Sequence, residues 1–355
     1  MKRIGLIWIS FWLASCGLFG QYEKVYNMLT IPATQRSLSL YRGQLQMNVG
    51  YLHGLGTQKY NSAGSRLSFV ESAGTYLAND LSFQLSYGIL DFIELSAAMD
   101  YIGHIESLAT IMFWDGENLN EVNTDRQIRG PGLLDLFLTL KQPFFKSGFD
   151  FDLWGGFSIP VFSHTPSEPL HSISILSPSD PDSPYNLNYH YKFKPASNVS
   201  MWHAGFDTKL LFKHFALTGS GFYKGPTGAE QTYRWDHTLY GDQFTHMAYS
   251  YERLPAANLN FNFTPAYQAF PWFAISLSLN HHSEYGGWTE ETGSRLAIPE
   301  RSMGTISPGF EILVSALLRW HLNFDIPVYG KNSYAIYSIR SGLSINLVPF
   351  KSHYK

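Results

Sequence analysis

Apolar and polar residues alternate along most of the chain. Residues 81–102, "LSFQLSYGILDFIELSAAMDYI", contain two alternating runs joined by a few residues at Gly88. The first run places Leu81, Phe83 and Leu85 on one parity, with serine or glutamine between them. A period of two residues is that of a β-strand with one apolar face. This stretch therefore predicts a hairpin of two strands, each apolar on one side only.

The same alternation recurs to the end of the chain, for example in "QLQMNVGY", "LLDLFLTLK", "NLNFNF" and "YSIRSGLSINLV". About twelve strands are predicted in all. No helical periodicity of useful length follows the first twenty or so residues, and no internal segment approaches the roughly 18 consecutive apolar residues of a transmembrane helix. The sequence therefore predicts an all-β chain.

The connections between the predicted strands alternate in length. Short turns fall near Gly88, Gly148, Lys213, Pro271 and Leu317, and a short "YGKNS" turn precedes the last strand. The other connections are long and polar, at residues 53–73, 104–131, 163–198, 225–256 and 283–303. Tight periplasmic turns alternating with long extracellular loops are typical of outer-membrane barrels. The prediction is a transmembrane antiparallel up-and-down β-barrel of about twelve strands over residues 38–350.

The polar faces of these strands carry charges of both signs. A charge in the lipid near the bilayer midplane costs a few kcal/mol, whereas charges inside a wide barrel are hydrated or paired. We therefore expect the apolar faces to contact lipid and the polar faces to line the lumen. The predicted lumen-lining residues are Glu94, Asp100, Lys141, Asp207, Lys209, Arg319, His321, Asp325 and Arg340. Two alternatives remain: charges that only hold the barrel in shape, and a soluble exported β-protein.

The N-terminus, "MKRIGLIWISFWLASCGLFGQ", has a short basic region, an apolar stretch too short to span a bilayer, and small residues. These features predict a secretory signal peptide over residues 1–20. Cys16 is the only cysteine, so no intramolecular disulfide forms. "LASC" resembles the lipobox of bacterial lipoproteins, which implies a lipid-modified Cys16; the alternative is ordinary cleavage nearby, with Cys16 discarded. Residues 21–37 are predicted as a periplasmic segment, either a lumen plug or a linker.

Three stretches resemble the outer-membrane barrel family named after the MetA pathway of phenol degradation. They are the hairpin in "LSYGILDFIELSAAMDY", the strand entry in "GPGLLDLFLTLKQPFF", and the closing hairpin in "SPGFEILVSALLRWHLNFDIPVYGKNS". The resemblance covers roughly residues 40–350, with Leu134 inserted between the glycine and Asp135 of the second motif. It implies a channel or transporter for small solutes, apolar ones included, in the outer membrane of a Gram-negative-type bacterium.

One motif favours a different activity. "SLNHHSEYGG" places His281 and Ser283 on the apolar parity, which predicts that they face lipid near the extracellular end of a strand. The pair resembles the His-x-Ser motif of outer-membrane phospholipases and lipid A deacylases, although Glu284 stands where that family has asparagine. His281 would act as the general base for Ser283 in lipid hydrolysis. A noncatalytic surface or scaffold barrel is the third hypothesis.

Composition limits the remaining possibilities. The formal net charge is −3 and no basic patch stands out, so nucleic-acid binding has little support. Histidines in the predicted loops do not show metal-ligand spacing, and no phosphate-binding glycine loop is present, so no metal or cofactor is expected. The expected partners are outer-membrane lipids, a small-molecule solute and the barrel-assembly machinery.

Overall fold

The computed structural model describes most of the predicted barrel. The described residues are 38, 40, 42–68, 75–114, 119–141, 148–161, 170–175, 187–193, 199–240, 243–291, 293–315 and 317–347. The predicted signal peptide, its Cys16 and the segment 21–37 lie outside them. Nowhere in the described part of the chain is there a helix of the length and apolarity needed to cross a membrane.

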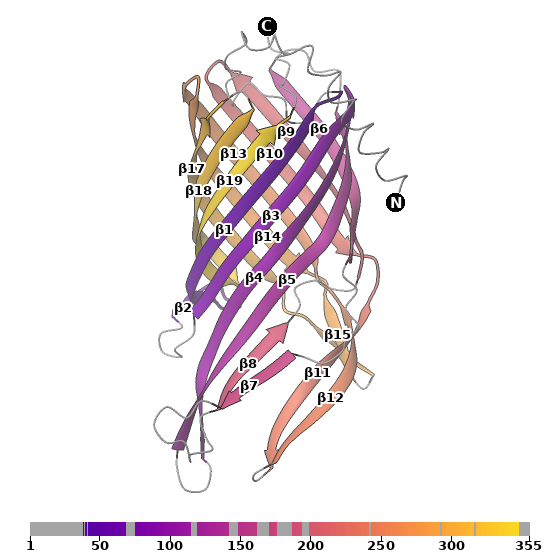
Figure 1. Ribbon diagram of the computed structural model, residues 1–355, viewed down its shortest axis with the longest axis vertical. Helices are drawn as coiled ribbons and strands as arrows, with labels where there is room; N and C mark the ends of the chain where they lie inside the picture. Colours follow the sequence, from indigo (N-terminus) through magenta and orange to yellow (C-terminus); the bar gives the residue numbers. More distant parts are fainter. Residues whose placement is uncertain are drawn as a thin grey trace, which may run out of the picture.

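Twelve antiparallel strands form a closed barrel (Figure 1). They are β1 (Leu45–Tyr60), β3 (Thr75–Leu90), β4 (Ile93–Trp114), β5 (Leu119–Lys141), β6 (Phe149–Ile159), β9 (Met201–Phe212), β10 (Phe215–Pro226), β13 (Ala257–Phe270), β14 (Phe273–Tyr285), β17 (Arg301–Leu313), β18 (Leu318–Lys331) and β19 (Tyr334–Asn346). The sheet closes because β1 pairs with β3 on one side and with β19 on the other. The predicted architecture and strand number are confirmed.

The two rims of the barrel differ, as the connection lengths predict. Two-residue turns join β3 to β4, β9 to β10 and β13 to β14 at one rim, at the top of Figure 1. In the turn after β9, Lys213 adopts a φ of 50°, which a tight reversal requires and an L residue rarely adopts. By the rule for outer-membrane barrels this rim is periplasmic and the opposite rim extracellular.

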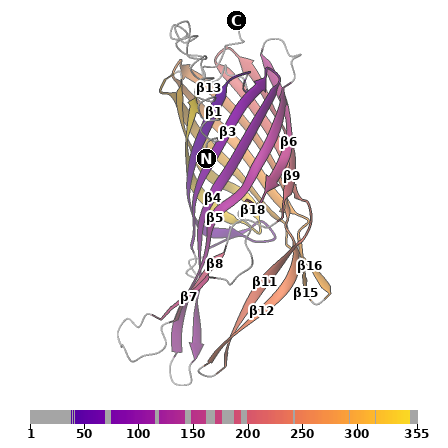
Figure 2. The ribbon, with the colours of Figure 1, turned by 45° about the vertical axis from the view of Figure 1, so that its right-hand side comes forward.

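Additional hairpins extend from the extracellular rim (Figures 1 and 2). They contain β2 (Arg66–Ser68), β7 (Leu170–Ile175), β8 (Leu187–Phe193), β11 (Glu230–Tyr240), β12 (Gln243–Leu254), β15 (Trp288–Glu291) and β16 (Ser294–Ala297). The expectation of a loop over residues 104–131 is wrong. There β4 and β5 stay paired as far as Trp114 and Leu119, so inter-strand hydrogen bonds satisfy backbone groups that a loop would leave to solvent.

The outer wall of the barrel is apolar. Large side chains on the predicted apolar parity are exposed, including Leu85 at 49%, Phe157 at 58% and Phe263 at 47%. Their polar neighbours along each strand point to the inside, where Ser86 and Ser158 are almost completely buried. A soluble protein that exposed such a band would aggregate, whereas a bilayer covers it. The apolar faces of the strands therefore contact lipid.

Introducing a charge at an outward position tests this assignment. Leu85→Arg is expected to lower the free energy of unfolding by about 2–4 kcal/mol, because the guanidinium would lie in hydrocarbon. Gln84→Arg, one residue away and directed inward, should cost much less. Both values come from denaturant unfolding of the refolded barrel in lipid vesicles. Equal losses in the two variants would contradict the proposed lipid face.

Candidate functional site: the barrel lumen

The periplasmic half of the lumen contains buried polar groups. The Glu94 side chain on β4 is held there: Ser96 Oγ donates to its Oε1 at 2.9 Å, and Ser96 is bonded in turn to Ser86 Oγ at 2.7 Å. The backbone N–H of Leu40 donates to the other carboxylate oxygen, Oε2, at 2.6 Å. Since Leu40 is only 4% exposed, the chain just before β1 enters the barrel at this rim.

Further predicted lumen residues lie on the inner faces of β5, β6 and β9 in the same half. Lys141 is the register partner of Asp152, which is in turn opposite Asp207 on the next strand. Lys209 is opposite Asp150 and is 7% exposed. Basic and acidic side chains on neighbouring strands stabilise each other across the sheet. These positions face the lumen, and their part in conduction stays a prediction.

Arg319 and His321 lie near the periplasmic end of β18. Arg319 forms an ion pair with Glu311 at 3.3 Å and donates to Ser344 Oγ at 3.0 Å. The imidazole of His321 lies over Gly342 on β19, where an added Cβ would come within 2.3 Å of the ring. The glycine therefore provides the space that directs His321 along the inner wall.

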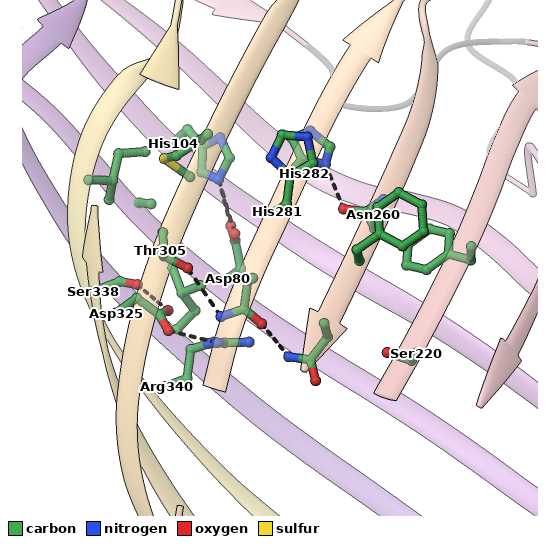
Figure 3. Close-up of a pocket in the computed structure, with 18 of the residues that line it drawn as sticks. Asp80, His104, Ser220, Asn260, His281, His282, Thr305, Asp325, Ser338 and Arg340 are labelled. Carbon is green, nitrogen blue, oxygen red and sulfur yellow. Dashed lines mark hydrogen bonds and ion pairs between the residues drawn. The ribbon is translucent and has the colours of Figure 1, made fainter. Parts of the chain in front are cut away.

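The extracellular half of the lumen contains a cavity of about 550 Å³ (Figure 3). One part of its wall is aliphatic and includes Leu52, Ala78 and Ile336 from β1, β3 and β19. Another part carries amides, among them Asn260 on β13, whose Oδ1 accepts a hydrogen bond from His282 Nδ1 at 2.7 Å. Among the described residues, no three His, Cys, Asp or Glu side chains are grouped to hold a metal ion.

A continuous hydrogen-bonded belt crosses the inner wall from β13 to β18. The Asn262 amide donates to Asn280 Oδ1, and the Asn280 amide donates to Ser307 Oγ at 2.9 Å. Ser307 then donates to Asp325 Oδ1 at 2.6 Å. Each of these side chains lies on a different strand, so the belt ties four neighbouring strands together from the inside. Polar networks of this kind are stable when every member is satisfied.

Asp325 is the centre of this network. It is 8% exposed and accepts hydrogen bonds from Ser307, from Ser338 Oγ at 2.6 Å, and from Arg340 Nη2 at 2.6 Å. The Arg340 side chain itself is 43% exposed, because its guanidinium extends along the cavity wall (Figure 3). The structure thus brings together two predicted lumen residues, one as a buried anchor and the other as an accessible donor.

A second cluster lies on β3 and β4, with only β1 between β3 and β19, and sequence reasoning missed it. The Asp80 carboxylate contacts His104 Nε2 at 3.0 Å, and His104 Nδ1 is 2.7 Å from the Tyr76 hydroxyl. Tyr76 also stacks on Tyr334 with ring centroids 4.6 Å apart. Strand parity directs Asp80 and His104 inward, but residues from 104 onward were expected to form a loop.

Asp100 lies on the inner face of β4, exposed to the lumen and within electrostatic range of Asp80, Asp135 and Lys224. Lys224 Nζ on β10 contacts both oxygens of Asp135 on β5, at 2.8 and 3.1 Å. Two strands, β6 and β9, separate these partners, so the lysine side chain crosses part of the lumen. This ion pair was not predicted either.

His281 and Ser283 lie on the outer face of β14, as their parity predicts. His281 Nδ1 is 2.8 Å from the Tyr329 hydroxyl, and the tyrosine ring crosses Gly304, where an added Cβ would be 2.1 Å from it. Ser283 Oγ donates to the carbonyl of Leu259 at 3.5 Å. Each of the two side chains thus contacts a group other than its motif partner, and a catalytic role for them stays a prediction.

Comparison with solved structures agrees with this architecture. The chain is similar to a crystal structure of an outer membrane channel from Pseudomonas putida F1, with a TM-score of 0.57, 13% identity, and coverage of 89% of this chain and 98% of that one. Weaker similarities include the TodX monoaromatic hydrocarbon channel (TM-score 0.46, 10% identity, 90% and 93% coverage) and the NanC porin (0.39, 10%, 85% and 98%). No family model and no curated protein matches the sequence significantly.

At this level of identity the similarity concerns the fold. The closed barrel, its apolar outer wall and its polar interior define the protein as an outer-membrane β-barrel of the architecture found in channels and porins.

Proposed function

We propose that this protein is a passive outer-membrane channel for small solutes that are partly apolar. The observation that carries the proposal is the cavity of about 550 Å³ in the extracellular half, lined by aliphatic side chains and by amide, acidic and basic ones. Such mixed walls are typical of sites for small molecules. The resemblance to the MetA-pathway barrels, whose members are regarded as transporters or porin-like channels, supports the same function.

The mechanism is diffusion down a concentration gradient through a wall with fixed charges. Carboxylates outnumber basic groups among the inward charged side chains named above. The carboxylates are Asp80, Glu94, Asp100, Asp135, Asp150, Asp152, Asp207, Glu311 and Asp325, and the basic groups are Lys141, Lys209, Lys224, Arg319 and Arg340. Rings of carboxylates favour cations in aqueous pores. We therefore expect a moderate cation preference.

Single-channel recording in planar bilayers tests the proposal. The wild type should give stable conductance steps with cation preference. Asp100→Ala should reduce that preference because it removes an accessible lumen carboxylate, and Arg340→Ala should increase it because it removes an accessible cation. Trp272→Ala changes a ring in the turn at the periplasmic rim and serves as the control.

A correctly folded barrel without conductance would overturn the channel function. That result would favour a plugged scaffold or the lipid hydrolase. Loss of phospholipid cleavage in Ser283→Ala would then identify the hydrolase.

A further inference from the structure

Four rings form a continuous patch on the inner face of the barrel, which we name the aromatic wall. It consists of Phe137 on β5, Trp154 on β6, His203 on β9 and Phe222 on β10. The Trp154 ring centroid lies 5.9 Å from Phe137, 5.8 Å from His203 and 5.6 Å from Phe222. Because each ring comes from a different adjacent strand, the wall covers about a third of the circumference. An apolar surface of this size is unfavourable in contact with water, so its presence in the lumen indicates a binding role.

Glycines make room for these rings. A Cβ on Gly205 would come within 2.5 Å of the Trp154 ring and 2.7 Å of Phe222 Cβ, so the indole occupies the space above the Gly205 backbone. Gly156 is equally constrained, since its Cβ would lie 1.9 Å from the carbonyl oxygen of Leu136. The Trp154 ring therefore lies close against the backbone of β9 at Gly205.

The aromatic wall faces the polar network across the lumen. In the strand order, β6 and β9 are six strands away from β18 and β19 in either direction, which places them diametrically opposite. Figure 1 shows β6 and β9 on the right of the barrel and β17 and β18 on the left. Phe222 lines the same cavity as Arg340, which places this end of the aromatic wall in the section of the lumen that contains the polar network.

The basic side chains in this section of the lumen are paired with nearby carboxylates. Arg340 is paired with Asp325 at 2.6 Å, and Lys224 beside the rings is paired with Asp135 at 2.8 Å. A guanidinium already paired with a carboxylate offers N–H groups without a free positive charge. The amides of Asn260 and Asn262 lie on β13 beside the rings, and Asn260 is the register partner of Phe222. Neutral amides and paired charges suit uncharged hydroxyl groups.

We propose that this section of the lumen binds neutral pyranose sugars. A pyranose ring has a face of C–H groups, which would stack on Trp154 and Phe222, and a rim of hydroxyls, which would bond the amides of Asn260 and Asn262 beside Phe222. Stacking supplies affinity with little orientation cost, and the neighbouring amides supply directional hydrogen bonds. The inference rests on the proposed channel function, whose partly apolar solute it specifies.

The test is block of the ion current by methyl β-D-glucopyranoside in bilayers that contain the full protein. We expect millimolar glucoside to reduce the open-channel current in a saturable manner. Trp154→Ala should weaken this block about tenfold, since it removes the main stacking surface. Trp154→Phe should retain most of it. Trp272→Ala alters an aromatic residue at the periplasmic turn, and the glucoside should block its current as strongly as that of the wild type.

Folding of each variant is checked by its heat-modifiable migration in detergent gels. Equal block in Trp154→Ala and the wild type would overturn the sugar site, and so would block by benzoate or phenol with none by the glucoside. If Trp154→Ala does not fold, Phe222→Leu replaces it with the same expected direction. An open channel that no glucoside blocks refutes only this inference, whereas absence of any current refutes the proposed function.

Discussion

Asp325→Ala is expected to lower the free energy of unfolding by about 3 kcal/mol. The substitution leaves Arg340 without its buried carboxylate and removes the acceptor of Ser307 and Ser338. Removing one partner of a buried charged pair usually costs more, but the Arg340 side chain is 43% exposed and water will solvate part of its charge. The loss is measured by equilibrium unfolding in urea with the barrel in lipid vesicles.

Asp325→Asn is the matched comparison. The amide keeps the shape and one acceptor oxygen, and the serine hydroxyls can rotate to accept from its N–H groups. We expect it to lose about half as much stability as Asp325→Ala. If both substitutions were nearly neutral, the hydrogen bonds of Asp325 would not contribute to barrel stability, and their role would be confined to the solute path.

The fold follows from the sequence because a membrane barrel constrains every strand in the same way. Each spanning residue faces either lipid or lumen, so hydrophobicity alternates with period two even though each strand is short. The run from Leu81 to Tyr87 predicts the orientation of β3 without any knowledge of its neighbours. The alternation of short and long connections, broken only by the "YGKNS" turn before the last strand, then predicts closure and the two rims. No long-range information is needed for these conclusions.

The sequence predicted only the charged residues of the lumen, and not the aromatic ones. Glu94, Asp325 and Arg340 stand out because a charge on the polar parity has a clear meaning. Trp154 and Phe222 do not, since sorting residues by hydrophobicity assigns aromatic rings to the lipid face. Their inward direction depends on strand register and on the neighbouring glycines. Partners such as Lys224 and Asp135, far apart in sequence, meet only because of the curvature of the closed sheet.

The second large effect is expected at the periplasmic rim, where Glu94 holds the chain segment before β1. Leu40 is 4% exposed and Gln44 is 3% exposed, so this part of the chain occupies space inside the barrel. The bond from the Leu40 N–H to Glu94 Oε2 is 2.6 Å long and buried. Loss of a charged acceptor for a buried donor costs about 1–3 kcal/mol.

Glu94→Ala is therefore expected to raise single-channel conductance severalfold, because a loss of about 1.4 kcal/mol already lowers the ratio of bound to released segment tenfold. Glu94→Gln retains an acceptor oxygen, so its conductance should stay close to that of the wild type.

Glu311→Ala is the control for the change in lumen charge. It removes another inward carboxylate near the same rim, and this carboxylate pairs with Arg319 and not with Leu40. The measurement is conductance in symmetric salt. An equal rise in Glu94→Ala and Glu311→Ala would mean that lumen charge, and not the bound segment, limits the current.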